Sequence, residues 1–425
     1  MDTTSAPKKD EYKFNRLAYI LESLFEYCIS IITSGAYLAK LTTTIGISDA
    51  MTAILSSVAS LAAMFQIFSI FLAHKTPVKR WVFPMTVIPQ ALIATLYLIP
   101  FLGLGAAAPI LFFIIILINS ASHNIVAPAK SDWFFSPVEP SKRGDFQAKI
   151  SIVSIIGGTA FTFIAGLTID KYEEAGNLNS LFIILTVVIF LLALLQMFCL
   201  LFAKCPDTKQ EKKTSPFKSV NTLLKNKSFV QVLILSCVWA VANNITTPFL
   251  STYQIKELGF SMSFISTVTI ALSFFNILAV FLAGKYSTKH SYSSLFKASF
   301  VFALLGFAVI SFTTTANGHV MFTIYRVFNL FFGAALGVSS TALIFSIVDE
   351  GERTVSLAFK SVLTGLVGFV TTLVASPIMT GLQNANITLF GITIFAQQIL
   401  AFISFCITAL ILVYYQFFCK GLNKS

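Results

Sequence analysis

Charged residues are scarce in this chain, and their scarcity excludes an ordinary soluble globule. Only 11% of the 425 residues are Asp, Glu, Lys or Arg, against about 25% in a typical soluble domain. Hydrophobic residues make up 56%. So few charges cannot cover the surface of a water-soluble domain, and no stretch of the chain has the composition of one. We therefore expect lipid to surround most of this protein.

The patterns of several kinds of site are also missing. The six cysteines lie in apolar runs or basic loops, which predicts no disulfide framework. The sequence contains no CxxC motif, no His–Cys cluster and no GxxxxGK[ST] motif, and its four histidines are scattered. We therefore expect no metal, no cofactor and no enzymatic activity. The net charge of +11 is interpreted as basic loops that set membrane topology, with no nucleic-acid partner.

What the chain has in abundance is long apolar runs. Runs of this length predict membrane-spanning helices, because each backbone group must be satisfied within its own segment, whereas barrel strands are shorter and alternate. The N-terminal segment 1–16 is polar for too long to begin a signal peptide. Twelve spans are predicted, near 17–40, 50–73, 81–102, 106–129, 147–169, 180–203, 229–253, 261–284, 292–314, 320–345, 357–382 and 389–417.

The basic residues give the orientation. Most Lys and Arg residues fall in segments that lie inside if the N-terminus is inside, and the outer loops hold only Lys40, Lys171 and Lys256. The loop 204–228 carries seven Lys and has the composition of a linker. The predicted organisation is a cytoplasmic segment 1–16, a six-helix bundle 17–203, the cytoplasmic linker 204–228, a second six-helix bundle 229–417 and a cytoplasmic tail 418–425.

The two halves resemble each other. "FLAHKTPVKR" at 71–80 matches "FLAGKYSTKH" at 281–290, and "FSPVEPSKRGDFQAKIS" from Phe135 matches "FSIVDEGERTVSLAFKS" from Phe345, both at an offset of 210. Asn119 and Asn329 share this offset, and "GIS" at 46 matches "GFS" at 259 at an offset of 213. Parallel six-helix repeats predict pseudo-twofold symmetry about the membrane normal and binding near the midplane.

With twelve spans, a basic central loop and repeated loops after spans 2 and 8, the chain resembles the major facilitator superfamily. That family's loop after span 2 usually runs Gly-x-Leu-Ala-Asp-Arg-x-Gly-Arg-Lys; here "LAHKTPVKR" has His74 in place of the acid and Pro77 in place of a Gly. The resemblance implies an all-α fold of two pseudo-symmetric six-helix bundles, with spans 1, 4, 7 and 10 lining a cavity. It also implies cytoplasmic gating loops, whose candidate residues are His74, Lys75, Lys79, Arg80, Arg143, Lys285, Lys289 and Arg353.

Span 1 has a polar face, which predicts a functional site on this helix. Tyr19, Glu22, Glu26, Ser30, Thr33 and Tyr37 recur every three or four residues, which predicts one helical face. A carboxylate as deep as Glu26 marks a functional site by default. His123 in span 4 lies at a similar depth, and a His–Glu pair would suit proton coupling. The proton-coupling candidates are thus Glu22, Glu26 and His123; the alternatives are a structural ion pair for the acids and a backbone hydrogen bond for His123.

Other polar residues in the spans are candidates for a substrate cavity. Arg326 in span 10 could bind a substrate anion, balance Glu26 across the cavity, or extend to the outer surface. Trp239 could stack on a flat or sugar-like substrate or pack in the core, and the Asn residues could bind substrate or join helices. The candidates are Tyr19, Ser30, Thr33, Tyr37, Asn119, Asn124, Trp239, Asn243, Asn244, Tyr325, Arg326 and Asn329.

The predicted function is secondary active transport of a small organic solute by alternating access, coupled to protons, in a bacterial inner membrane and by a monomer. An uncoupled facilitator of the same fold is an alternative. A lipid-modifying enzyme, receptor or scaffold is disfavoured, because no catalytic cluster and no soluble signalling module can be found. The substrate and the direction of transport do not follow from the sequence.

Overall fold

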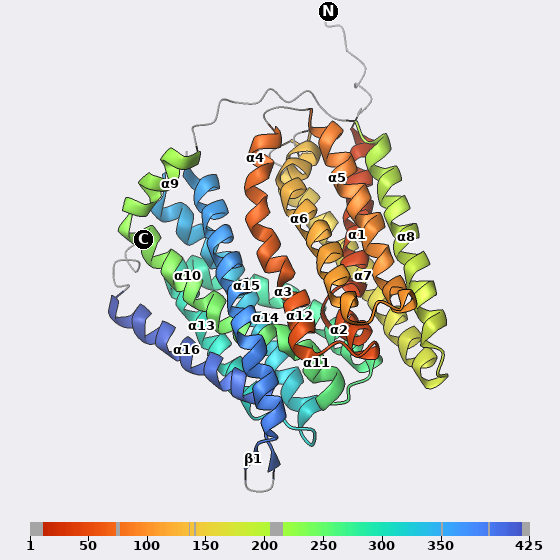
Figure 1. Cartoon of the computed structure of the whole chain (residues 1–425). Coiled ribbons are helices and arrows are strands. Elements are labelled where there is room, and N and C mark those ends of the chain that lie inside the picture. Colours follow the sequence, from red (N-terminus) through yellow and green to blue (C-terminus); the bar gives the residue numbers. More distant parts are fainter. Residues whose placement is uncertain are drawn as a thin grey trace, which may run out of the picture. The chain divides into compact units, whose positions relative to one another are not determined.

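The computed structural model describes residues 12–73, 77–135, 137–139, 142–204, 216–349, 352–389 and 392–418. These residues are almost entirely helical (Figure 1). Twelve helical segments among them are long and apolar enough to span a membrane, which agrees with the predicted number. Internal contacts divide the chain into two units. Unit 1 holds residues 1–33 and 65–211, and unit 2 holds residues 34–64 and 212–425.

Unit 1 is built from helices whose long faces are apolar. A core of Ala18, Trp81, Val126, Phe134 and Leu200 joins its first, third, fourth and sixth spans. Its elements are α1 (Lys13–Ile32), α4 (Phe68–Ala73), α5 (Val78–Ile93), the 3₁₀ segments η2 (Ala94–Leu102) and η3 (Gly105–Ala107), α6 (Ala108–Phe135), α7 (Arg143–Glu174) and α8 (Leu178–Phe202). The 3₁₀ segment η1 (Ala63–Ile67) crosses the boundary between the units.

Unit 2 has an aromatic core that includes Phe229, Phe296, Phe300, Phe332 and Tyr415. Its main elements are α2 (Gly35–Thr44), α3 (Asp49–Ala62), α9 (Pro216–Lys225), α10 (Lys227–Thr246), η5 (Thr247–Phe249), α11 (Leu250–Thr252), η6 (Tyr253–Glu257), α12 (Met262–Lys289), α13 (Tyr292–Ser311), α14 (Gly318–Ile347), α15 (Arg353–Ala385), β1 (Thr388–Leu389), β2 (Ile392–Thr393) and α16 (Ala396–Phe418).

The internal repeat is visible in local structure. Helices α7 and α15 begin at Arg143 and Arg353, which correspond to each other in the longer sequence repeat. Ser48 and Ser261, the serines of the matching "GIS" and "GFS" stretches, each cap the next helix by accepting a hydrogen bond from a backbone N–H three residues on. Each of these serines follows, by two residues, a glycine with positive φ, Gly46 or Gly259. The shared turns agree with the internal sequence repeat.

Span 1 differs from its prediction, because it is not one continuous helix. Helix α1 ends at Ile32, Ser34 is extended, and Gly35 has a φ of 54° before α2 begins. The left-handed conformation of Gly35 is readily available only to glycine. The polar face predicted from Tyr19 to Tyr37 is therefore interrupted, and Tyr37 belongs to unit 2.

Two other predicted boundaries are wrong. Span 4 is predicted to end at 129, but α6 continues to Phe135 and keeps Lys130 inside the helix. Span 12 is predicted from 389, but α16 begins at Ala396, because the segment before it is rich in β-branched residues and Thr388–Leu389 pair with Ile392–Thr393 in an antiparallel hairpin. The bounds predicted for span 2, 50–73, agree with the structure, although this stretch changes from α3 to the 3₁₀ segment η1 and then to α4.

Candidate functional site

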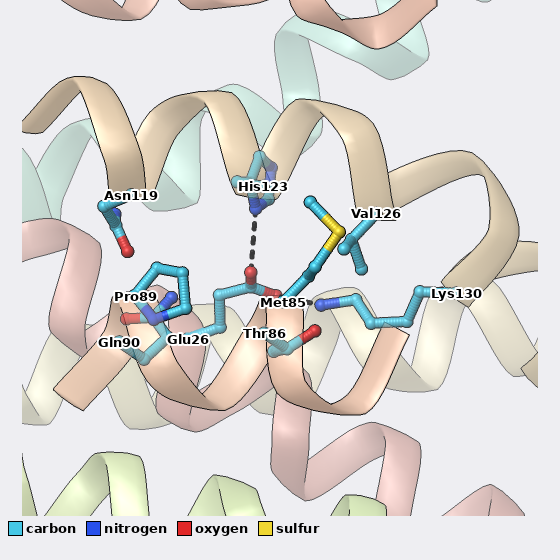
Figure 2. A pocket seen from close by; sticks show the side chains of 9 residues that line it. All are labelled: Glu26, Met85, Thr86, Pro89, Gln90, Asn119, His123, Val126 and Lys130. Carbon is cyan, nitrogen blue, oxygen red and sulfur yellow. Dashed lines mark hydrogen bonds and ion pairs between the residues drawn. The ribbon is translucent and has the colours of Figure 1, made fainter. Parts of the chain in front are cut away.

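A buried group of charged side chains lies inside unit 1, with Lys130 at its centre. The Lys130 ammonium is 2.8 Å from Oε1 of Glu22 and 2.6 Å from Oε2 of Glu26. The other oxygen of Glu26 is 2.8 Å from Nδ1 of His123. Figure 2 shows the Glu26 carboxylate between His123 and Lys130. We call Glu22, Glu26, His123 and Lys130 the charge cluster.

Helical spacing explains how the sequence builds this cluster. Glu22 and Glu26 are one turn apart on α1, so their side chains leave the helix on the same side. His123 and Lys130 are seven residues, or two turns, apart on α6 and likewise share one side. The long side chain of Lys130 spans the two acids.

The four side chains differ in their access to solvent. Glu22 is 0% exposed and Lys130 is 6% exposed, whereas Glu26 is 18% and His123 is 50% exposed. Gln196 of α8 donates a 2.8 Å hydrogen bond from Nε2 to Oε1 of Glu22. Lys130 and Gln196 therefore bind the same oxygen of Glu22 within the core, while Glu26 and His123 form the accessible edge of the cluster.

The charges of the cluster balance only with an added proton. Two carboxylates and one ammonium leave a net charge of −1 when His123 is neutral, and a proton on His123 or on Glu26 brings the sum to zero. Unbalanced charge is costly in a medium of low dielectric constant. The cluster therefore has the composition of a site that can take up and release one proton.

A small cavity borders the accessible edge of the cluster. It has room for about one water molecule, which is too little for an organic solute. Its polar lining includes Gln90, whose buried Oε1 has no hydrogen-bond partner among the described residues. The lining residues come from α1, α5 and α6 and are Glu26, Met85, Thr86, Pro89, Gln90, Asn119, His123, Val126 and Lys130 (Figure 2).

The sequence places Glu22, Glu26 and His123 at similar depth, and the structure brings them together. Sequence reasoning misses Lys130, because a span 4 that ends at 129 leaves this residue in an inner loop. It misses Gln90 and Gln196 as well, since nothing in their own helices marks them. A signal for Lys130 does exist: Asn119, His123 and Lys130 follow one another at spacings of four and seven, which places them on one side of α6.

Among the described residues, the remaining unit 1 candidates other than Asn119 have local partners. Tyr19 stacks on Phe134 with ring centroids 4.4 Å apart. Ser30 donates to the backbone oxygen of Tyr27, Thr33 to that of Ile29 and Asn124 to that of Ser120. Asn119 lines the small cavity. These contacts give most of the group a structural explanation, and their roles in substrate binding stay predictions.

In unit 2, most of the predicted cavity residues also have packing partners. Trp239 lies against Phe300, Phe307 and Phe332, with centroids 4.3–6.0 Å apart. Asn243 accepts a hydrogen bond from Thr247, and Asn244 donates one to the backbone oxygen of Ala240. The hydroxyl groups of Tyr37 and Ser266 share a hydrogen bond, and the ring of Tyr325 is buried against that of Phe322. Asn329 is exposed.

Arg326 differs from these residues. Its guanidinium donates a long hydrogen bond, 3.4 Å, to Oγ1 of Thr269 on α12. None of the ion pairs among the described residues includes it. Glu26 has Lys130 and His123 as partners within its own unit, and the suggested balance between Arg326 and Glu26 stays a prediction.

Three of the described gating-loop candidates donate hydrogen bonds to backbone oxygens near helix ends. Lys79 donates to the backbone oxygens of Leu201 and Ala203 at the end of α8. Arg143 donates to the oxygen of Val138, and Arg353 to that of Phe345. Arg80, Lys285 and Lys289 are exposed. His74 and Lys75 lie outside the described residues. A role in gating stays a prediction for the whole set.

No group of three or more His, Cys, Asp or Glu side chains in the described part of the chain is arranged to hold a metal ion.

Comparisons with known proteins agree on the fold. A nucleoside transporter structure, NupG, has a TM-score of 0.71 at 18% identity and covers 96% of this chain and 99% of its own. A D-xylose–proton symporter has a TM-score of 0.72 at 14% identity, covering 98% and 100%. The inward-open xylose transporter XylE from E. coli has a TM-score of 0.67 at 13% identity, covering 95% of each chain.

No curated protein matches the sequence. The model of one family does match, over residues 17–371, which is most of the chain and includes the charge cluster and Arg326. Its description agrees with the twelve helical spans and with the solved structures of similar fold. This multi-pass membrane protein belongs to the Major Facilitator Superfamily.

Proposed function

We propose that this protein is a proton-coupled secondary transporter that moves a small organic solute across the cytoplasmic membrane by alternating access. The observation that carries the proposal is the charge cluster. It sits within the membrane-spanning part of unit 1, where charges are costly and are retained mainly for function. The structures of similar fold are named as transporters of a nucleoside and of xylose, one of them as a proton symporter, and these names support a polar solute and proton coupling.

His123 and Glu26 are proposed to carry the proton. Half of the His123 side chain is exposed, so it can receive a proton from water and become an imidazolium that donates to Glu26. The 2.8 Å contact from Nδ1 to Oε1 allows the proton to pass to the carboxylate, leaving neutral imidazole and a neutral carboxyl group. Release follows the same atoms in reverse.

Glu22 is proposed to anchor Lys130. Its carboxylate is fully buried and is bound by both Lys130 and Gln196. When Glu26 is neutral, Lys130 keeps one charged partner, Glu22, and its attraction to Glu26 weakens. The link between α1 and α6 through Glu26 therefore depends on the proton, and this dependence is the proposed switch that biases alternating access.

The orientation, location and assembly of the protein are part of the proposal. Basic residues favour loops on the cytoplasmic side, so we place both termini in the cytoplasm of a bacterial cell with the protein in its inner membrane. We expect a monomer. The division into two six-helix bundles, 17–203 and 229–417, is proposed as the pair of bodies that move.

The test is proton flux in proteoliposomes that contain a pH-sensitive dye. A library of organic solutes is added outside, and a solute that is co-transported or exchanged with protons changes the internal pH. Glu26→Gln is expected to abolish the solute-dependent pH change, and His123→Gln to slow it at least tenfold. Glu139→Gln is the matched control, because Glu139 is an exposed acid outside the spans that pairs with Lys142.

Two outcomes would contradict the coupling. If solute enters at the same rate with and without a pH gradient, the protein is an uncoupled facilitator. If Glu26→Gln folds and keeps the full solute-dependent pH change, the charge cluster is structural and another group carries the proton.

A further inference from the structure

We infer that unit 2 carries an anion-binding face on α14, so that the solute transported by the proposed function bears a carboxylate or phosphate group. This inference rests on the proposed transport function and narrows its substrate class. The face is defined by Arg326, Gly333, Gly337 and Ser340 of α14, together with Lys360 of α15, and is called the α14 face below.

The first observation is that Arg326 has no counter-charge among the described residues. Its polar contact there is the 3.4 Å hydrogen bond to the Thr269 hydroxyl. None of the ion pairs among the described residues includes Arg326, so no carboxylate there lies within 4.0 Å of its guanidinium. A guanidinium cannot lose its charge, so it needs an anion or water.

The positions of the described acidic residues of unit 2 explain why none of them pairs with Arg326. Asp49 is at the start of α3, where it binds Lys256 at 2.6 Å and Gln383 at 2.8 Å. Glu257 ends η6. The other two described acids, Asp349 and Glu352, lie beyond the far end of α14, roughly 30 Å along the helix from Arg326 at about 1.5 Å per residue.

Arg326 is also not placed at a helix end. It is eight residues after Gly318, where α14 begins, or roughly 12 Å at about 1.5 Å per residue. Its partner Thr269 is likewise about two turns inside α12. The contact directs the guanidinium toward a neighbouring helix at this depth, so extension to the outer surface does not explain it.

The second observation is another cation without an acid partner, on the same face. Lys360 of α15 donates from Nζ to the hydroxyl of Ser340 on α14. None of the ion pairs among the described residues includes Lys360 either. Ser340 follows Arg326 by close to four helical turns, so the two positions lie on one side of α14.

The helix surface between the two cations is open. Gly333 and Gly337 occupy this side of α14, and a Cβ atom placed on either would meet no atom within 4 Å. Asn329, one turn from Arg326, is exposed and supplies a further amide donor. On α12, Ser266, Thr269, Ser273 and Asn276 recur at spacings of three and four and add neutral polar groups.

Cations and neutral donors without acids make a surface that favours anions. A cationic solute would meet two uncompensated positive charges, whereas a carboxylate or phosphate would neutralise them in turn. Arg326 suits both groups, because its guanidinium can bind two oxygens of either at once. An organic anion is therefore the class of solute that this face fits.

The test measures equilibrium binding, so it does not depend on transport. The thermal stability of the purified full chain in detergent is followed at constant ionic strength with paired probes: benzoate and benzamide, nicotinate and nicotinamide, and glucose 6-phosphate and glucose. At least one anion is expected to stabilise the wild type more than its neutral partner does. The carboxylate and phosphate pairs distinguish the two possible anionic groups.

Variants then locate the binding. Arg326→Gln is expected to weaken anion binding at least tenfold, Arg326→Lys less, and Lys360→Gln several-fold. Lys149→Gln is the matched control, since Lys149 is an exposed lysine about two turns into α7 of unit 1, and it should leave binding unchanged.

The inference is overturned if no anion stabilises the wild type more than its neutral partner, or if folded Arg326→Gln binds the anion as tightly as the wild type. Anion binding without any solute-dependent proton flux would count against the proposed coupling alone. If a neutral solute drives proton flux and Arg326→Gln does not change that flux, the proposed transport function stands, but the inference that the solute is an anion is wrong.

Discussion

The two units treat buried charge in opposite ways. In unit 1, Lys130 is shared by two carboxylates, and His123 adds a group that can be charged or neutral. In unit 2, Arg326 and Lys360 donate to hydroxyl groups in place of acids. A matched buried charge is costly to deprive of its partner and can respond to a proton, whereas an unmatched charge destabilises the empty protein and is available to a ligand. This difference is the basis on which we propose proton chemistry for unit 1 and anion binding for unit 2.

The largest effect is expected from removing the central cation of unit 1. Lys130→Met leaves two carboxylates facing each other, and breaking a buried ion pair in this way costs about 3–5 kcal/mol. Thermal unfolding in detergent should show a large loss of stability, whereas Lys360→Met in unit 2 should show little change. Adding Glu22→Gln to Lys130→Met should recover part of the loss. If Lys130→Met and Lys360→Met lower the thermal stability equally, the proposed difference between the two units is wrong.

Backbone packing offers the next contrast. A Cβ at Gly365 of α15 would lie 2.3 Å from the backbone oxygen of Ser60 on α3, which cannot move without shifting the helix. At Gly158, in the first repeat, a Cβ would meet the side chain of Tyr27, which can rotate. Gly365→Ala should therefore destabilise by about 1–3 kcal/mol, and Gly158→Ala by less, as measured by thermal unfolding.

Gly381→Ala is the control for that experiment, because it lies on the same helix, α15, with no atom within 4 Å of a new Cβ. Alanine is the better helix former there, so a gain of about 0.5–1 kcal/mol is expected. A loss of stability at Gly381 comparable to that at Gly365 would mean that the helix itself, and not the contact with α3, is sensitive.

Replacing Arg326 should change the stability of the protein less than replacing Lys130 does, and in the opposite direction. Replacing an unmatched cation by a neutral side chain removes a desolvation cost, so Arg326→Gln should stabilise the ligand-free protein by on the order of 1 kcal/mol. Unfolding without added organic anions is the measurement. A marked loss of stability would show that Arg326 has a partner in the folded protein and would weaken the contrast between the units.

The smallest effect concerns the outer ion pair of unit 2. Lys256 is 38% exposed, and its partner Asp49 is also bound by Gln383. An ion pair with this much solvent contact is worth about 0.2–1 kcal/mol, so Lys256→Gln should lower stability only slightly. Raising the salt concentration should reduce the difference between wild type and variant.

Particular residues show how far sequence reasoning reaches. The similar depth of Glu26 and His123 in their spans predicts that they pair, and in the structure Nδ1 of His123 lies 2.8 Å from Oε1 of Glu26. Lys130 escapes prediction when a span is ended at the first charge, although α6 continues five residues beyond it. The break at Gly35 cannot be found by periodicity, since the spacing of polar residues continues across it.

The sequence by itself determined the membrane environment, the number of spans, the internal repeat and the family, because these depend on hydropathy and on patterns along one chain. Only the tertiary structure decided which charges are matched. Spacing fixes the side of a helix from which a residue points, but not which helix lies opposite. The meeting of Glu22, Glu26 and Lys130, and the lack of a described acid near Arg326, follow from how neighbouring helices pack and rotate.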